Sequence, residues 1–305
     1  MPKIGYVILA HQNPSQLARL LQRIEQDSNM LFVHIDRGAD LGQFLTCKGL
    51  VGIKNLIFLK KRYNSYWGSI GLVNATMEGI QAALTHNCDH IILLSGSDYP
   101  IKNNKEIQAF LAANNGKSFV NYYTMPALHW QPNKEINRIK KYYFYINSKL
   151  FEYPNPPEVK SLPRKVLSLI LSVFLKKERE FPRNITPYGG DQWFCITQAA
   201  GRKVLDFYFE HPEVMRFLKY CLIPDEIFIQ TALLNSGDEY FITTIVNDPI
   251  VLINWKNRGI DPSPSLFEKA DFNKLKASEK LFARKFNHDI HPELADQIDS
   301  ELLSK

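Results

Sequence analysis

The sequence predicts an α/β fold of Rossmann type, with a mixed, mostly parallel sheet flanked by helices. Continuous apolar runs, typical of strands that are buried on both faces, recur through the first 100 residues. Segments with the apolar spacing of helices separate these runs, so strands and helices alternate along the chain. The 305 residues are 45% hydrophobic and 22% charged, which is ordinary for a globular protein with a full core.

The first part of the chain carries the clearest alternation. The run at residues 4–10 (IGYVILA) is entirely apolar and predicts a buried strand. The next segment places Leu17, Leu20, Leu21 and Ile24 on one stripe, which predicts a helix that covers the sheet. We expect strands at residues 4–10, 31–35, 55–59 and 89–94, and helices at residues 15–26, 70–84 and 105–113.

The pattern changes after residue 120. Residues 121–160 are rich in Tyr, Asn, Pro and Lys and lack periodicity, so we expect a long, partly ordered excursion of the kind that carries ligand contacts. Regular elements then return. We expect a turn into a strand at residues 189–197, helices at residues 198–209, 211–220, 224–235, 275–286 and 292–303, and strands at residues 240–246 and 250–254.

The charge balance restricts the partners. A net charge of +6 suits an anionic ligand or an anionic membrane surface. The basic residues are dispersed, so nucleic acid is the least favoured partner. The four cysteines form no C-x-x-C pair, which favours buried free thiols in a reducing compartment.

Two observations bear on location. The N-terminus shows no signal-peptide pattern, and no segment reaches the roughly 18 apolar residues that span a bilayer. We expect a cytoplasmic protein, with peripheral contact at the inner membrane face as an open alternative. Residues 162–177 (LPRKVLSLILSVFLKK) have an apolar centre between basic ends. They predict either a core helix with snorkelling cations or an interfacial helix lying on anionic lipid.

Three polar residues follow predicted strands: His11, Asp36 and Asp98. Ligands of parallel sheets bind at the carboxyl ends of strands, so the placement of these residues makes them candidates. Asp36 suits a hydrogen bond to a ribose or a uracil, or else serves the turn before Gly38. His34 shares its strand face, but two ligands without a third are weak support for a metal site.

Two glycine-containing segments are candidate sugar contacts. Asp98 lies in the loop Ser95-Gly96-Ser97-Asp98, without the D-x-D pair that many sugar-nucleotide transferases use to hold a divalent cation. Gly190-Asp191-Gln192-Trp193 joins a carboxylate to an aromatic face, which suits a sugar ring. The alternative for the second segment is a glycine turn that leads into a core strand.

Glu226 occupies the expected start of a helix, with Pro224 in its first turn. Acidic residues at such positions complement the helix dipole, which is the structural interpretation. The functional interpretation is a general base, which needs a pKa near the working pH. We expect Asp225 to point elsewhere, because neighbours in a helix do not share a face.

Arg284 and Lys285 fall late in the last-but-one predicted helix. They either complement the C-terminal dipole or neutralise a departing diphosphate, since charge on a leaving group needs a preorganised partner. We interpret His288, Asp289 and His291 as part of a solvated linker. A metal-dependent site built on these three residues remains the alternative.

Taken together, these segments resemble the core-2/I-branching glycosyltransferase family, which includes the peptide O-xylosyltransferases. The separate segments are weakly specific, but their order and spacing run through the whole chain. The resemblance is carried by residues 8–14, 33–37, 67–69, 94–102, 132–135, 190–194, 224–226 and 282–286.

The resemblance implies a GT-A type fold and an inverting transfer of N-acetylglucosamine or xylose from a UDP-sugar to an acceptor hydroxyl, in glycan or surface polysaccharide assembly. It implies no divalent metal and no other cofactor. The acceptor would be a carbohydrate or glycolipid. A non-catalytic carbohydrate-binding protein that retains the fold is the alternative.

These expectations assign a role to each candidate residue. We expect a single domain, with a nucleotide-binding half at residues 1–120 and an acceptor and catalytic half at residues 121–305. The assignments are Glu226 as base with Asp191 beside the reacting sugars; His11, Asp36, Arg284 and Lys285 on the donor; and Trp193, Lys134 and Asp98 on the acceptor.

Overall fold

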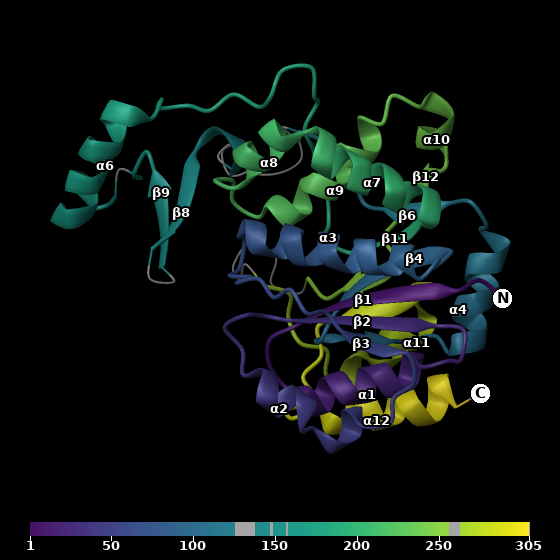
Figure 1. Ribbon diagram of the computed structural model, residues 1–305. Coiled ribbons are helices and arrows are strands. Elements are labelled where there is room, and N and C mark those ends of the chain that lie inside the picture. Colours follow the sequence, from purple (N-terminus) through teal and green to yellow (C-terminus); the bar gives the residue numbers. More distant parts are fainter. Residues whose placement is uncertain (126–137, 147–148, 157, 256–262, 305) are drawn as a thin grey trace.

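A seven-stranded sheet lies at the centre of the protein (Figure 1). The computed structural model describes residues 1–125, 138–146, 149–156, 158–255 and 263–304. The strands follow the order β12-β6-β11-β4-β1-β2-β3. Their bounds are β1 (Ile4–Ala10), β2 (Met30–Ile35), β3 (Leu56–Phe58), β4 (His90–Ser95), β6 (Ser118–Val120), β11 (Phe194–Thr197) and β12 (Ile245–Val246).

All of these strands except β11 run in the same direction. β1 pairs in parallel with β2 and β4, β2 with β3, and β6 with β12. β11 is antiparallel to both of its neighbours, β4 and β6. The predicted mixed, mostly parallel sheet is therefore confirmed. Because β11 is reversed, the residues that precede it lie at the edge where the other strands end.

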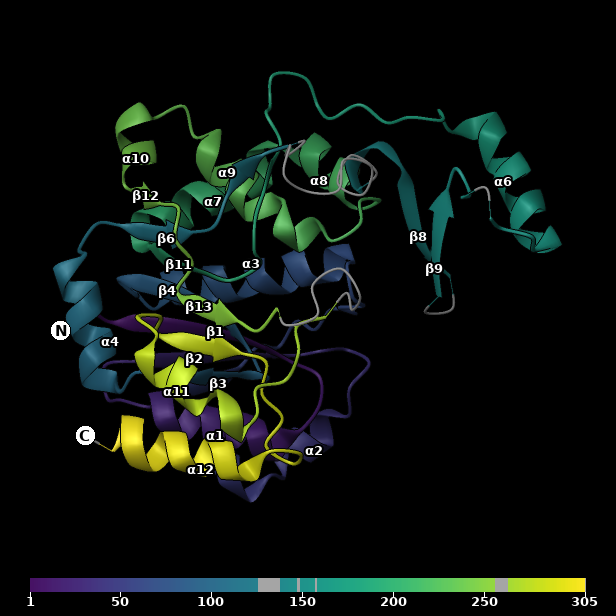
Figure 2. The same ribbon diagram turned by 180° about the vertical axis from the view of Figure 1, so that it is seen from behind.

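The sheet is covered on both faces. Side chains alternate along β1: Ile4, Tyr6 and Ile8 belong to one core cluster, and Val7 and Leu9 to the other. Figures 1 and 2 show α1, α11 and α12 on one face and α3, α7 and α9 on the other. The helices are α1 (Pro14–Ile24), α2 (Leu41–Leu45), α3 (Ile70–Thr85), α4 (Asn104–Ala113), α6 (Leu162–Phe174), α7 (Gln198–Glu210), α8 (Pro212–Leu218), α9 (Phe228–Leu234), α10 (Glu239–Thr243), α11 (Phe272–Ala277) and α12 (Pro292–Ile298), with 3-10 turns at Lys48–Leu50, Pro224–Glu226 and Lys269–Asp271 and a π-helical turn at Asp299–Leu303.

The predicted helix at residues 275–286 is wrong. α11 ends at Ala277, and β14 (Phe282–Arg284) follows as the middle strand of a small sheet between β13 (Val251–Ile253) and β5 (Asp98–Pro100). Phe282 and Ala283 are fully buried, as expected of a central strand covered on both faces. This pairing sets Arg284 directly opposite Asp98.

The predicted strand at residues 240–246 is also wrong over most of its length. Residues Glu239–Thr243 form α10, and only Ile245–Val246 pair as a strand. The side chain of Asp238 accepts a hydrogen bond from the backbone N–H of Phe241, which caps the helix. This N-cap is a local signal that outweighs the β propensity of the aromatic and β-branched residues that follow.

The excursion at residues 121–160 contains regular structure. β8 (Tyr142–Ile146) and β9 (Lys149–Tyr153) form an antiparallel hairpin, and β7 (Tyr123–Thr124) pairs with β10 (Tyr188–Gly189). β8 packs on the body, where the Tyr143 backbone N–H donates to the Tyr220 carbonyl at 3.0 Å, and α6 stands away from the body on the far side of the hairpin (Figures 1 and 2). The predicted helix at residues 162–177 is confirmed over Leu162–Phe174. Among the described residues, no helix combines the length and apolarity that crossing a membrane requires.

The cysteines behave as predicted from their spacing. All four are free thiols; Cys88, Cys195 and Cys221 are buried, and Cys47 is half-buried. Burial raises the pKa of the Cys88 and Cys221 thiols to about 11. These thiols therefore stay protonated at neutral pH and serve as small apolar core residues.

Candidate functional site

A cavity of about 510 Å³ opens at the carboxyl edge of the central sheet. It lies where β1 and β4 end, with strands leading away on both sides, which is the position where open α/β sheets bind ligands. Its volume is in the range of small-molecule sites. Seven of the predicted site residues line it: His11, Asp36, Asp191, Trp193, Glu226, Arg284 and Lys285. Lys134 falls outside the described residues.

Asp98 lies beneath the cavity and is not part of its wall. The carboxylate is completely buried and accepts hydrogen bonds from the Ser95 backbone N–H at 2.7 Å and the Trp193 Nε1–H at 2.7 Å. It also accepts one from Arg284 Nη1 at 2.7 Å. With the Ser95 hydroxyl at 3.0 Å, four polar contacts satisfy its two oxygens. This placement supports a positioning role for Asp98.

Arg284 is held rigidly at the cavity wall. Besides its bond to Asp98, its guanidinium lies over the Trp193 ring at 4.4 Å from the centroid. Its Nε is buried and has no hydrogen-bond partner among the described residues. A guanidinium fixed on one side by a buried carboxylate and stacked on an indole is preorganised to bind an anion. Lys285 adds a second cation next to it in the same lining.

His11 lies at the end of β1 on the cavity wall. Burial lowers the pKa of its imidazole, Asp36 raises it, and the nearby cations Lys285 and Arg284 lower it further. The imidazole is therefore neutral near pH 7 and offers one donor and one acceptor to a ligand. The coupling to three charged residues of the lining places His11 beside the basic end of the cavity.

Asp36 organises a loop at the cavity. One carboxylate oxygen accepts a hydrogen bond from the Gly38 backbone N–H at 2.7 Å, and the other from the Ser65 backbone N–H. The predicted turn contact is thus present, and the carboxylate also lines the cavity. His34 is buried, and its Nε2 accepts the backbone N–H of Tyr63 at 3.0 Å. Burial lowers the pKa of His34 to about 4, so it is a neutral structural residue.

The segment that contains Asp191 enters the site because of backbone packing. A side chain at Gly190 would place its Cβ 1.9 Å from the Asn121 carbonyl oxygen, so only glycine fits there. The side-chain amide of Gln230 holds the Asp191 carbonyl oxygen at 2.7 Å. The predicted turn into a strand is confirmed, because β11 begins at Phe194. Asp191 and Trp193 reach the cavity since β11 runs opposite to the parallel strands.

Glu226 ends a 3-10 turn, Pro224–Glu226, that precedes α9. Its carboxylate lines the cavity and forms an ion pair with Arg138 at 2.8 Å, where both side chains are largely buried. Sequence reasoning missed Arg138, which lies in a segment without periodicity. The guanidinium orients one carboxylate oxygen of Glu226, as expected of a group that has to meet a ligand in one geometry.

The expectation for Asp225 is wrong, because it also lines the cavity. In a 3-10 turn the side chains are spaced differently from those of an α-helix. Asp225 is buried and its Oδ1 has no hydrogen-bond partner among the described residues. Burial, and secondarily the charge of Glu226, raise the pKa of Asp225 to about 8. Asp225 is therefore a neutral acid beside a carboxylate near pH 7.

Asp225→Asn is expected to gain stability relative to the parent as the pH rises. The folded parent keeps the Asp225 proton up to pH about 8, whereas the unfolded chain loses it near pH 4. The folded state binds more protons in this window, so the free energy of unfolding of the parent falls as the pH rises. The advantage of the variant should grow by at least about 1 kcal/mol between pH 5 and pH 8, in urea unfolding.

Asp206→Asn, at an exposed position of α7, is the matched control for this experiment. Its stability difference from the parent should stay constant over the same pH range. A constant difference for Asp225→Asn as well would contradict the burial of a protonated Asp225.

Possible metal ligands do not come together in the described part of the chain. No group of three or more His, Cys, Asp or Glu side chains suited to a metal ion occurs there. His288 is buried against Tyr99, with ring centroids 4.7 Å apart, and burial lowers its pKa to about 4. His291 lies beside Glu293 at 3.6 Å. The interpretation of residues 288–293 as a solvated linker is therefore wrong for His288.

A family model and several curated relatives match most of this chain. The profile described as Core-2/I-Branching enzyme matches residues 4–277. Human xylosyltransferase 2 is 25% identical over 98% of this chain and 34% of its own length. Rat xylosyltransferase 1 is 23% identical over 98% of this chain and 35% of its own length. The chain thus spans about a third of the length of these curated relatives.

The similarity to solved structures is weaker. The apo structure of the WbbM bifunctional glycosyltransferase covers 93% of this chain and 45% of its own, with 9% identity and a TM-score of 0.37. A structure described as mannose-1-phosphate geranyltransferase from Thermus thermophilus covers 75% of this chain and 72% of its own, with 11% identity and a TM-score of 0.30. Scores this low support no conclusion about shared chemistry.

Proposed function

The chain belongs to the Core-2/I-Branching enzyme family, and on this premise we propose that it is an inverting, metal-independent glycosyltransferase. It would move N-acetylglucosamine or xylose from a UDP-sugar to a hydroxyl of a carbohydrate or glycolipid, in glycan or surface polysaccharide assembly. One observation carries the proposal: a single cavity is lined by a carboxylate, Glu226, and by an adjacent cation pair, Arg284 and Lys285.

The reaction is a single displacement. Glu226 takes the proton of the acceptor hydroxyl, and the freed oxygen forms a bond to the anomeric carbon. The bond from that carbon to the diphosphate oxygen breaks on the opposite face, which inverts the configuration. The electron pair leaves with UDP. Arg284 and Lys285 balance the charge that develops on the diphosphate, and such balancing accounts for a large share of rate enhancement in sites of this kind.

The remaining residues position the substrates. Asp36 and His11 line the cavity. We assign them to the donor, where they would hydrogen-bond a ribose or a uracil edge. Asp191 and Trp193 lie just before β11 on the cavity wall and suit the sugar rings. Asp98 acts through Arg284 and Trp193, because it is buried and hydrogen-bonded to both. The donor role of the cation pair is also the reason to propose that no divalent ion is needed.

A thermal-shift experiment tests this proposal. UDP, UDP-N-acetylglucosamine and UDP-xylose at about 100 times their Kd should raise the free energy of unfolding by about 2.7 kcal/mol, which is a rise in Tm of several degrees. The shift should be the same in excess EDTA, because the proposed site needs no divalent ion. UMP should give a smaller shift, because it lacks the β-phosphate that the cation pair would bind. Absence of a UDP shift, or a shift abolished by EDTA, would contradict the proposal.

A further inference from the structure

α6 exposes the most extended apolar row among the described residues. Six large side chains of α6 are between 49% and 79% exposed, and none of its 13 residues is buried. In α1, by contrast, the apolar stripe is completely buried. Soluble monomers rarely expose contiguous apolar patches of this kind without a partner. The exposed row consists of Leu162, Val166, Leu169, Ile170, Val173 and Phe174.

The row occupies one side of the helix. Its members follow the spacing i, i+4, i+7, i+8, i+11 and i+12, so they share a face. The opposite side carries the half-buried Leu167, Leu171 and Leu175. The hairpin and the segment after it contact α6 at Arg164. The Arg164 guanidinium lies over the Phe151 ring of β9 at 4.9 Å from the centroid, and Asn155 Nδ2, after β9, donates to the Arg164 carbonyl at 2.9 Å. The exposed row therefore points away from the body of the protein.

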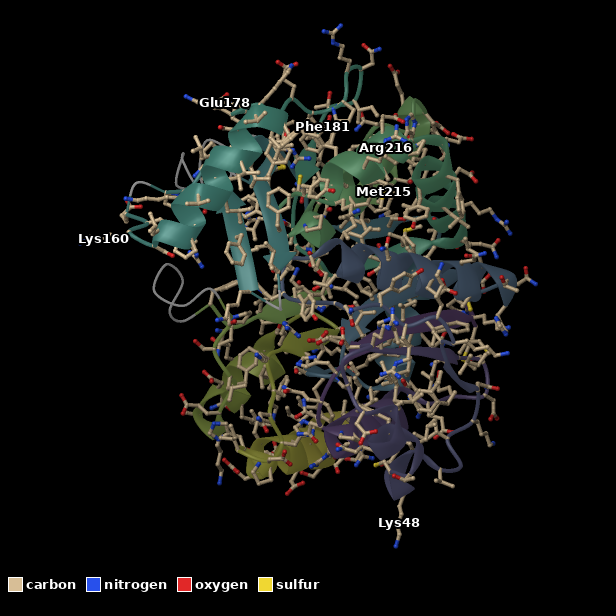
Figure 3. The ribbon with its side chains drawn as sticks, turned by 60° about the vertical axis from the view of Figure 1, so that its left-hand side comes forward. Lys48, Lys160, Glu178, Phe181, Met215 and Arg216 are labelled. Carbon is tan, nitrogen blue, oxygen red and sulfur yellow. The ribbon has the colours of Figure 1, made fainter. Side chains whose placement is uncertain are left out.

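The charges around the row are mainly positive, since six cations and three carboxylates, Glu158, Glu178 and Glu180, lie within residues 158–180. Residues 159–177 contain five cations and no carboxylate: Lys160, Arg164, Lys165, Lys176 and Lys177. In Figure 3, Lys160 and Glu178 mark the two ends of α6 on the outer side of the molecule. A second copy of this chain would bring like charges together. An anionic lipid surface complements them and also accepts the apolar row.

The length of α6 indicates how it would lie. Thirteen residues at about 1.5 Å each span roughly 20 Å, less than the roughly 30 Å hydrocarbon core of a bilayer. We propose that α6 is a docking surface that lies in the plane of an anionic lipid bilayer, with its apolar row among the acyl chains and its cations among the headgroups. Of the two interpretations of residues 162–177, the buried core helix is excluded by the exposure of α6.

The hairpin links this surface to the cavity. The Tyr145 ring of β8 stacks on Tyr66, with centroids 5.4 Å apart, and the Tyr145 hydroxyl donates to the Trp67 carbonyl. Tyr66 and Trp67 line the cavity. Docking would thus hold the cavity beside the headgroups, where a glycolipid acceptor lies. This last step rests on the proposed function, whereas binding of the bilayer does not.

Vesicle flotation tests the docking surface. The full chain is mixed with vesicles of phosphatidylcholine alone, or with vesicles that also contain about 30 mol% phosphatidylglycerol, which makes their surface negative. We expect binding to the anionic vesicles at low salt and release at about 0.5 M salt, because the attraction is screened. Ile170→Ser/Val173→Ser/Phe174→Ser should lower the partition coefficient at least about tenfold. Lys165→Gln/Lys176→Gln/Lys177→Gln should lower it about a hundredfold, since each cation contributes a factor of about five.

Matched controls lie at the opposite end of the molecule, where Figure 3 places Lys48. Leu45→Ser/Val51→Ser removes comparably exposed apolar side chains and should leave binding unchanged. Lys48→Gln/Lys105→Gln/Lys117→Gln removes three exposed cations elsewhere on the surface. It should lower the partition coefficient less than about threefold, because the attraction of a charge to the bilayer falls off over the Debye length.

Three outcomes would overturn the inference: no flotation of the parent, equal loss in the control variants, or a dimer in sedimentation that only the α6 variants dissociate. The UDP thermal shift separates the two proposals. If the Tm of the parent rises with UDP but the parent does not float, only the docking proposal is overturned. If the parent floats but its Tm does not rise with UDP, only the proposed function is overturned.

Discussion

Glu226→Gln should lower turnover roughly a thousandfold, because general bases contribute about 10²–10⁴ to such reactions. The amide keeps the shape of the side chain. Its oxygen can still accept the hydrogen bond from Arg138, which is 2.8 Å long in the parent. The amide cannot take up the proton of the acceptor hydroxyl. The measurement is UDP release from UDP-N-acetylglucosamine or UDP-xylose with a panel of mono- and oligosaccharides, together with UDP affinity by calorimetry.

UDP affinity should stay within about twofold in this variant, since the carboxylate acts on the acceptor and the lost interaction belongs to the transition state. Glu239→Gln, in the first turn of α10, is the control that removes a carboxylate outside the cavity lining. Unchanged turnover in Glu226→Gln would contradict the proposal that Glu226 is the general base. A parent that binds UDP but releases none with any acceptor would instead favour the carbohydrate-binding alternative.

Arg284→Gln should lose both stability and turnover. Removal of the guanidinium leaves the completely buried Asp98 carboxylate without its cationic partner, which costs about 3 kcal/mol of unfolding free energy. The loss of a preorganised donor to the diphosphate should lower kcat about 10²–10³-fold. Urea unfolding measures the first effect, and UDP release measures the second.

The double variant Asp98→Asn/Arg284→Gln separates these two effects. It removes both buried charges, so it should recover at least about 1 kcal/mol of the lost stability through the coupling of the pair. UDP affinity and turnover should not recover, because no cation returns to the wall. Recovery of turnover in the double variant would mean that Arg284 only neutralises Asp98.

Lys285→Gln, at the next position, should weaken UDP binding about tenfold with little effect on folding.

The elements with strong periodicity could be predicted from the sequence. The apolar run of β1 and the stripe of α1 determine a buried strand and an amphipathic helix locally, so both are present within one or two residues of their predicted bounds. His11 and Asp36 were found because strand ends can be read from such runs. The short elements were harder. The run at β14 is three residues long, and its partners β5 and β13 lie far away in the sequence.

The candidate site was predictable only in part. The segments at Gly190–Trp193 and Pro224–Glu226 carry recognisable combinations of residue types, and they do reach the cavity. The ion pair of Glu226 with Arg138 was not predicted, because no local pattern relates residues 88 positions apart. The buried state of Asp98 and Asp225 was missed for the same reason, since burial depends on what the rest of the chain places on top of a side chain.

The sequence by itself determined the alternation of strands and helices, the positive charge, and the residue types available at the strand ends. The tertiary structure decided which of them meet. The reversed β11 delivers Asp191 and Trp193 to the carboxyl edge, and the pairing of β14 with β5 sets Arg284 against Asp98. It also left the apolar row of α6 facing outward. Periodicity is a local property of the chain, whereas strand partners and burial depend on contacts between distant segments, and these contacts form the site.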